Sequence, residues 1–156
     1  MSTVIINAGS NRGDRRLNLS RALREIGERF GAFEMSHALV SEPWGFESTH
    51  KFLNVCFVVN TDKTPEEVLD ELQEIEKKIS PAPHRGVDGS YLDRVLDLDI
   101  VAIDDLVIDT ERLKVPHPHL AERRFFLEPL AEVAPGWRHP VTGKTADEML
   151  SELKED

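Results

Sequence analysis

The stretch Phe52-Leu53-Asn54-Val55-Cys56-Phe57-Val58-Val59-Asn60 is a nearly continuous run of Phe, Leu and Val. Such a run indicates a β-strand whose two faces are both covered by other parts of the protein. The segment Thr64-Pro65-Glu66-Glu67 then has an N-cap threonine, a proline for the first turn and a glutamate that can close a capping box. An apolar stripe follows, made of Val68, Leu72, Ile75 and Ile79. The middle of the chain therefore predicts a buried strand followed by an amphipathic helix.

The segments before this strand have a similar order. Thr3–Ala8 is a short β-branched run, and we expect a strand there. A helix should follow, capped by Asn11 or Asp14, because apolar residues recur at helical spacing until Gly31, which should end it. Phe33–Ser41 alternates loosely between apolar and polar residues and predicts a second strand.

The segments after the predicted second helix begin with a long loop, Ser80–Leu92, which is rich in Pro and Gly. A loop of this length inside a compact domain is usually functional. The remaining expectations are a strand over Val95–Ile103 with Leu106–Ile108 as its hairpin partner, an extended Arg112–His119, short helical turns over 120–133, and a last helix from the capping box at Thr145 to about Leu153.

The resulting order of strand, helix, strand, strand, helix, strand matches the β-α-β-β-α-β motif of ferredoxin-like α+β folds. A length of 156 residues suits one domain. We therefore expect a single domain over residues 1–156, with an antiparallel sheet and an additional C-terminal hairpin and helices.

The composition argues against several classes of protein. There are 29 Asp and Glu against 19 Lys and Arg, a net charge of −10, whereas a general binder of nucleic acid or anionic membranes needs broad positive potential. The single Cys56 excludes an internal disulfide, and its apolar neighbours predict a reduced, buried thiol. We find no secretory signal and no apolar run long enough to span a membrane, so we expect a cytoplasmic protein.

The segment Arg94-Val95-Leu96-Asp97-Leu98-Asp99-Ile100-Val101 is chemically the most informative. Side chains alternate along a strand, so Asp97 and Asp99 should point to one side and the apolar residues to the core. Two carboxylates about 6–7 Å apart at their backbones can hold Mg²⁺, which usually keeps water and substrate phosphates as further ligands. The alternative is a solvated sheet face, although neighbouring acids are disfavoured in strands.

Basic and aromatic residues suggest what a site beside these aspartates would bind. Arg94 precedes them, and a cluster of cationic or imidazole groups follows: Arg112, His117, His119, Arg123 and Arg124. Such clustering suits a polyphosphate pocket, and surface salt bridges are the alternative. Asn54 can read the edge of a flat heterocycle between the aromatic residues Trp44, Phe52 and Phe125, or bond a neighbouring strand. We interpret Gly9-Ser10-Asn11 as a strand-to-helix connection.

Taken together, these motifs resemble those of the 6-hydroxymethyl-7,8-dihydropterin pyrophosphokinase family. The resemblance rests on Arg94-x-x-Asp97-Leu98-Asp99-Ile100-Val101 and extends to Ala8-Gly9-Ser10-Asn11, Phe52-Leu53-Asn54, Glu111-Arg112-Leu113-x-Val115-Pro116-His117 and Arg123-x-Phe125. It implies a monomeric, ATP-dependent pyrophosphokinase with a ferredoxin-like core and two magnesium ions. Such an enzyme transfers pyrophosphate from ATP to the hydroxymethyl oxygen of the dihydropterin, releasing AMP, in folate biosynthesis.

The resemblance also implies roles for individual residues. Asp97 and Asp99 correspond to the ligands of both magnesium ions, and together with Arg94 and His117 they are the expected catalytic residues. The implied ATP contacts are Glu76, Arg85, Arg94, Ile100, Arg112, His117 and Arg123. The implied pterin contacts are Ser41, Pro43, Trp44, Phe52, Asn54 and Phe125. The chain departs from the family pattern at Glu42-Pro43-Trp44, in the loop up to Tyr91 and at Pro118.

Two other functions fit the residues at this point. A non-catalytic module would bind a nucleotide or a heterocycle without forming AMP. A metal-dependent phosphodiesterase would use the aspartate pair, although the acidic composition argues against a polynucleotide substrate. For the pyrophosphokinase, we expect in-line attack by the pterin hydroxyl, with most of the acceleration coming from positioning and with loop 80–92 closing over ATP.

Overall fold

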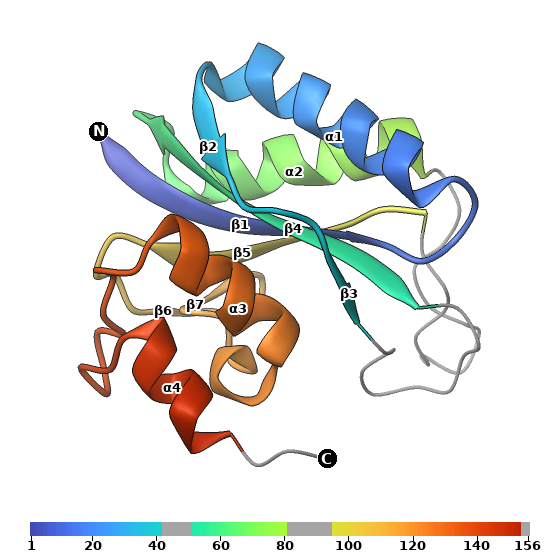
Figure 1. Ribbon diagram of the computed structural model, residues 1–156. Helices are drawn as coiled ribbons and strands as arrows, with labels where there is room; N and C mark the ends of the chain where they lie inside the picture. The colour runs from blue at the N-terminus through green and yellow to red at the C-terminus, as the bar shows by residue number, and fades with distance from the viewer. Residues whose placement is uncertain (42–50, 81–94, 154–156) are drawn as a thin grey trace.

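The computed structural model describes residues 1–41, 51–80 and 95–153. Its elements in chain order are β1 (Ser2–Ser10), α1 (Arg15–Phe30), β2 (Phe33–Met35), β3 (Leu39–Ser41), β4 (Phe52–Thr61), α2 (Pro65–Ile79), β5 (Asp97–Ile103), β6 (Ile108–Asp109), β7 (Lys114–Val115), a 3-10 turn η1 (Leu120–Glu122), α3 (Arg124–Val133) and α4 (Ala146–Glu152). Helices α1 and α2 lie on one side of the sheet, and α3 and α4 lie on the other (Figure 1). The predicted α+β class is confirmed.

The main sheet has five strands in the order β2-β4-β1-β5, with β3 also paired to β4. Strand β1 lies between its two long partners and runs antiparallel to both of them. The register on the β5 side shifts between Ile5 and Ile6, which marks a β-bulge in that pair. The strand from the apolar run, β4, is thus an interior strand of the sheet.

Two separate cores cover the two faces of this sheet. Alternate side chains such as Ile6, Val55 and Phe57 pack into a first core with α1 and α2. Their neighbours Ile5 and Cys56 pack into a second core with residues of α3 and α4. This alternation explains why β4 needs apolar residues on both of its faces.

Local hydrogen bonds explain where the helices begin. Of the two candidate caps for α1, the structure uses Asp14, whose carboxylate accepts a hydrogen bond of 3.1 Å from the Leu17 N–H. The capping boxes at Thr64 and Thr145 are both present, as predicted. Gly31 follows α1 with φ +85°, a conformation that favours glycine.

None of the described helices is both long and apolar enough to cross a membrane.

The prediction of one strand over Phe33–Ser41 is wrong, because the chain forms β2 and β3 with a break between them. Ser36 lies at this break, and its N–H donates to the Cys56 carbonyl at 2.8 Å. The Ser36 hydroxyl oxygen accepts a hydrogen bond of 3.0 Å from the Cys56 N–H, in place of a backbone carbonyl. A side chain thus completes the pairing with β4 and interrupts the regular ladder.

The predicted hairpin partner of β5 is also wrong. After β5 the chain turns at Asp104, with φ +47°, and the Leu106 N–H donates to the Ile103 carbonyl. Strand β6 then pairs with β7 and not with β5. An additional hairpin is therefore present, formed with later residues than expected. Residues 124–133 form the continuous helix α3, where the sequence predicted only short turns.

The burial of Cys56 gives a first testable prediction. The side chain is 1% exposed, and burial raises the pKa of its thiol to about 12. Because the thiolate is the reactive form, iodoacetamide at pH 8 should modify the native protein very slowly and the urea-unfolded protein rapidly. Mass spectrometry over time measures both rates, and equal rates would contradict the burial of this thiol.

Candidate active site

The aspartate pair lies at the start of β5, and both side chains face the same side of the sheet. Leu98 and Ile100 are buried in the first core with α1 and α2. Asp97 and Asp99 alternate with them, so they project to the other face, and both are partly exposed. The predicted arrangement of two carboxylates on one face, open to solvent, is confirmed as geometry.

The antiparallel register places further side chains in rows across this face. Asn54 of β4 pairs with Gly9 of β1, and Gly9 pairs with Asp97 of β5. With neighbouring strands about 4.8 Å apart, the backbones of Asn54 and Asp97 lie about 10 Å apart. The next row consists of Cys56, Asn7 and Asp99. The sheet thus carries two amides and two carboxylates on one surface with a fixed spacing.

Gly9 allows two side chains of β4 to lie across β1. A Cβ atom at this position would come within 3.0 Å of Asn54 Oδ1 and within 3.3 Å of a Phe52 ring carbon. The Asn54 amide group donates to Ser41 Oγ at 2.6 Å and to the Leu39 carbonyl at 3.3 Å. Three of the predicted pterin contacts, Ser41, Phe52 and Asn54, are therefore neighbours at the ends of β3 and β4.

His117 faces the carboxylates from the segment that follows β7. The backbone N–H of His117 donates to the Val101 carbonyl at 2.8 Å, which fixes this segment along β5. The His117 Nε2 atom lies 3.9 Å from Asp99 Oδ1. Nδ1 accepts a hydrogen bond from the His119 N–H, so the neutral ring carries its proton on Nε2.

The surroundings of His117 favour this neutral form. Burial, followed by the nearby Arg123 and His119, lowers the pKa of His117 to about 4, and Asp97 opposes the shift. The ring also contacts Phe126 edge-on, with centroids 4.8 Å apart. His117 thus offers an N–H donor beside Asp99 at neutral pH, and not a positive charge.

Arg123 supplies a cation on the same side of the sheet. It lies between η1 and α3, and its guanidinium carbon is 5.1 Å from the centre of the Phe126 ring and 5.6 Å from that of Phe125. Contacts of this kind hold the planar guanidinium group in place, and a guanidinium group can form paired hydrogen bonds with a phosphate. Phe125 is half-buried and packs against the second core.

Glu76 and Ile100 belong to the opposite side of β5. The Glu76 carboxylate accepts a hydrogen bond of 2.8 Å from the Leu98 N–H, so α2 covers the free edge of the sheet between the two aspartates. Ile100 is 5% exposed and packs in the first core. Glu76 and Ile100 therefore lie on the side of β5 that faces α2. Their roles near adenosine remain predictions.

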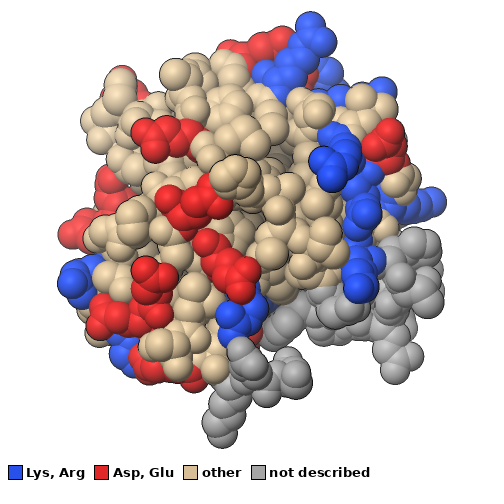
Figure 2. Space-filling view, in the orientation of Figure 1, with Lys and Arg blue, Asp and Glu red and all other residues tan. Residues whose placement is uncertain are grey.

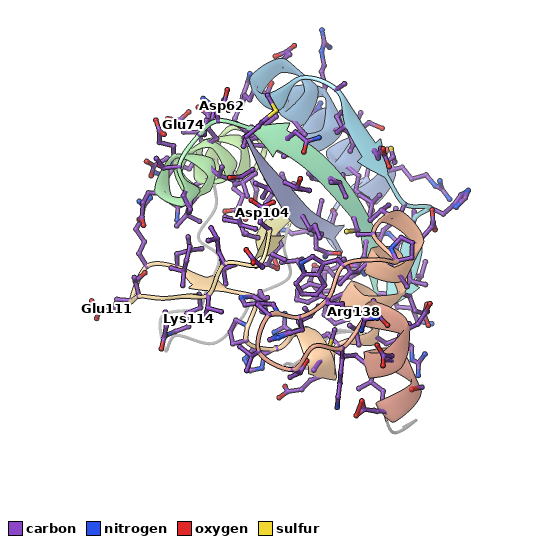
Figure 3. The ribbon with its side chains drawn as sticks, turned by 90° about the vertical axis from the view of Figure 1, so that its left-hand side faces the viewer. Asp62, Glu74, Asp104, Glu111, Lys114 and Arg138 are labelled. Atoms are coloured by element: carbon purple, nitrogen blue, oxygen red, sulfur yellow. The ribbon has the colours of Figure 1, made fainter. Side chains whose placement is uncertain are left out.

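Arg112 is not grouped with the aspartates in this structure. It lies in the β6–β7 hairpin and forms ion pairs with Asp70 and Glu66 of α2, the latter at 3.8 Å. Figure 3 shows the neighbouring Glu111 at the outer end of this hairpin, on the same side of the molecule as Glu74 of α2. A contact between Arg112 and ATP phosphates would require these ion pairs to be exchanged.

Four other predicted contacts, Pro43, Trp44, Arg85 and Arg94, lie outside the described residues, as does the loop expected to close over ATP beyond Ser80.

The donor set suits a hard cation with an incomplete protein shell. Within residues 1–41, 51–80 and 95–153 there is no group of three or more His, Cys, Asp or Glu placed to hold a metal ion. Asp97 and Asp99 provide carboxylate oxygens on one partly exposed face. Mg²⁺ is commonly bound by one or two carboxylates together with water and phosphate oxygens, so the pair fits this ion.

The surface charge is unevenly distributed in spite of the net charge of −10. Lys and Arg gather along the side of the molecule where α1 lies, whereas Asp and Glu are spread over the rest of the view (Figure 2). Arg12, Arg16, Arg21 and Arg24 on or before α1 are all exposed. Helix α1 begins just after β1, at the end of the strand where Gly9 lies. Arg12 and Arg16 therefore lie near this end of the sheet, on the side that α1 covers.

Two residues of this face, Gly9 and Asn7, were not predicted from the sequence. Gly9 looked like part of a simple connection, because nothing local shows that Phe52 and Asn54 cross it. Asn7 gave a signal that could have found it, since it is a polar residue in the apolar run Thr3–Ala8. In the structure Asn7 is 3% exposed and pairs in register with Asp99.

Comparison with known proteins gives a consistent result. The model of the family described as 7,8-dihydro-6-hydroxymethylpterin-pyrophosphokinase (HPPK) matches residues 5–135. The chain is 36% identical over 152 residues to the 2-amino-4-hydroxy-6-hydroxymethyldihydropteridine pyrophosphokinase of Aquifex aeolicus. The aligned region covers 97% of this chain and 92% of that protein. The protein of the same name from Porphyromonas gingivalis is 37% identical over 142 residues, covering 90% of this chain and 95% of that protein.

A solved structure shows the same fold at lower sequence identity. The HPPK-DHPS of Plasmodium falciparum matches with a TM-score of 0.74 and 16% identity over 97% of this chain. This chain spans only 44% of that longer chain. The match supports the arrangement of helices around an antiparallel sheet.

The pKa of His117 predicts how stability depends on pH in buffer without divalent ions. Between pH 6.5 and about 4 the unfolded chain binds a proton at this residue that the folded chain does not. The free energy of unfolding should therefore fall as the pH is lowered through this range, by at most about 3 kcal/mol from this group. Urea denaturation at pH 7 and pH 4.5 measures the fall.

The variant His117→Gln should show a smaller loss of stability between these two pH values. His37→Gln serves as the control, because the His37 side chain is 96% exposed, and it should behave like the wild type. An identical pH dependence in His117→Gln and the wild type would contradict the neutral, buried state of His117.

Proposed function

This chain belongs to the 7,8-dihydro-6-hydroxymethylpterin-pyrophosphokinase family and is a pyrophosphokinase of folate biosynthesis, and from this membership we propose how its residues carry out the reaction. The substrates are ATP and 6-hydroxymethyl-7,8-dihydropterin. The hydroxymethyl oxygen forms a bond to the β-phosphorus of ATP while the bond from that phosphorus to the α-phosphate oxygen breaks. AMP leaves with the electron pair, and the hydroxyl proton passes to solvent.

The observation that carries this proposal is the pair of rows across β4, β1 and β5. Asn54 and Asp97 are two strands apart in the same row, on the same face. A pterin bound at Asn54 would therefore have its reactive substituent directed along the row toward phosphates bound beside Asp97. Holding two reactants in this way can supply a large part of the acceleration.

The pterin is held by the group of residues around Gly9. Asn54 presents Oδ1 toward the space above Gly9, and its amide nitrogen is fixed by Ser41 and Leu39. A buried amide in a fixed orientation distinguishes a donor edge from an acceptor edge of a heterocycle. Phe52 lies beside it and Phe125 of α3 faces the same side of the sheet, so they are the proposed stacking residues, with Pro43 and Trp44 lining the same ring.

The phosphates of ATP are bound at the start of β5. We assign Asp97 and Asp99 to two Mg²⁺ ions, which when bound neutralise phosphate charge and make the β-phosphorus more electrophilic. His117 donates its Nε2 proton in a hydrogen bond to a phosphate oxygen, and Arg123 adds a positive charge nearby. Arg94, Arg85 and Arg112 complete the phosphate contacts, while Glu76 and Ile100 lie near adenosine.

A general base would have to accept the proton of the pterin hydroxymethyl group. Among the described side chains near the aspartates, His117 is the candidate base whose tautomer the structure defines. Its proton resides on the nitrogen that faces Asp99, so in its neutral form this nitrogen donates and cannot accept. The site therefore works by alignment and charge neutralisation, as is common in phosphoryl transfer.

The proposal extends to the whole protein. The sheet order and the alternation of strands and helices support a ferredoxin-like arrangement of one domain over residues 1–156. We propose that this domain acts as a cytoplasmic monomer on small-molecule substrates, without binding nucleic acid or membranes.

Replacing Asp97 tests the role of the carboxylates. Asp97→Asn keeps the size of the side chain but removes its charge, so AMP formation from ATP and hydroxymethyldihydropterin should fall at least 100-fold. Thermal stability should change little, because Asp97 is partly exposed and outside both cores. Asp62→Asn, at an exposed aspartate after β4, is the control and should keep wild-type activity. Near-normal activity of Asp97→Asn would contradict the assignment.

Replacing Gly9 tests the pterin position. In Gly9→Ala the new methyl group meets Asn54 Oδ1 and the Phe52 ring, so both must shift. The KM for the pterin should rise about tenfold or more, and the affinity for an ATP analogue should change much less. Gly136→Ala is the matched control, because a Cβ there meets no atom within 4 Å. Equal losses of affinity for both substrates in Gly9→Ala would contradict the assigned pterin position.

A further inference from the structure

Asn7 carries a buried polar atom that the protein does not satisfy. The residue is 3% exposed, and its Oδ1 has no hydrogen-bond partner among the residues that the structure describes. Leaving a buried acceptor without a donor destabilises the folded protein. Such an atom in a native fold calls for a reason, and a bound water or ion is a common one.

The neighbours of Asn7 limit what can satisfy it. On one side lies Cys56, whose thiol forms no hydrogen bond with Oδ1, and on the other side lies Asp99. Both share the face of Asn7, because Ile5, two residues earlier, packs in the second core. An ionised carboxylate only accepts hydrogen bonds, so Asp99 cannot serve as the donor.

Two acceptors therefore stand side by side on adjacent strands. Cβ atoms of residues directly opposite each other lie about 4.5–5.5 Å apart. One water molecule can reach both oxygens at this separation, and it has two protons to donate. Magnesium retains several water ligands even when it is bound by carboxylates. A water of this kind near Asp99 is thus the donor that the chemistry of the site supplies.

We propose that Asn7 is a positioning residue of the cation site: its Oδ1 accepts a hydrogen bond from a water molecule that is bound to the cation held by Asp99. This inference rests on the proposed function, because it needs a divalent cation at the aspartate pair. Asn7 acts through the water and touches neither substrate. Residues that hold the ligands of a metal in this way typically contribute 10- to 100-fold to metal affinity.

Cation binding tests this role without relying on turnover. The dissociation constant for Mn²⁺ is measured by electron paramagnetic resonance in the presence of a non-hydrolysable ATP analogue. Asn7→Leu keeps the number of non-hydrogen side-chain atoms but lacks the acceptor Oδ1. Asn7→Ala removes the amide without adding volume. Both should bind Mn²⁺ at least tenfold more weakly than the wild type. Cys56→Ala is the control on the other side of Asn7 and should bind Mn²⁺ like the wild type.

The melting temperature separates this role from a purely structural one. Asn7→Leu removes an unsatisfied polar atom, so its melting temperature without cations should equal or exceed that of the wild type. Folded variants that bind Mn²⁺ as tightly as the wild type would overturn the inference and leave the proposed function intact. A wild-type protein that binds no Mn²⁺ with the ATP analogue would instead overturn the proposed function itself.

Discussion

The antiparallel pairing of β1 with both β4 and β5 is the constraint on which the rest of the site depends. Because β1 lies between its partners, one register fixes the rows Asn54–Gly9–Asp97 and Cys56–Asn7–Asp99. A slip of one residue in either pair would turn every side chain of that strand to the other face. The two apolar cores oppose such a slip, since it would turn Phe57 and Ile6 from the first core toward the second. The register that packs the two cores thus also brings the side chains of the site together.

The electrostatics of the site follow from its place between two layers. The aspartates lie where β5 is partly open to solvent, so their charges remain available to a cation. His117 lies deeper, between β5 and the ring of Phe126, and burial there lowers its pKa. The same face therefore offers negative oxygens for a metal, a neutral donor and the cation of Arg123. Among the described residues, Arg123 is the cation that lies on this face with the aspartates, and the arginines of α1 lie on the other side of the sheet.

Much of this arrangement could be predicted from the sequence, because it depends on local periodicity. The alternation over residues 97–100 predicted which of these side chains face the core, and the capping residues predicted where α2 and α4 begin. Other features depend on contacts between distant residues. The break between β2 and β3 requires the Ser36 hydroxyl to replace a backbone group opposite Cys56, twenty residues later. No pattern within Phe33–Ser41 contains that information.

The site shows the same division between local and distant information. Asp97, Asp99 and Asn54 stand out because charged or amide side chains interrupt apolar strands. Gly9 and Asn7 become informative only when the register shows what lies across them. Arg112 is a predicted phosphate contact, and only the fold of the β6–β7 hairpin shows that it also pairs with Asp70 of α2. Sequence identifies the kind of chemistry, and the register of the sheet assigns the partners.

The proposed reaction requires divalent ions to bind on the face of β5 that carries Asp97 and Asp99. The most direct test is nuclear magnetic resonance of the ¹⁵N-labelled protein with Mn²⁺ and a non-hydrolysable ATP analogue, because Mn²⁺ broadens the signals of nearby amides. The account predicts strong broadening at Asn7, Gly9, Asp97, Asp99 and His117, and little at α4 on the far end of the second core. Broadening centred elsewhere, with the amides of Asp97 and Asp99 unaffected, would contradict it.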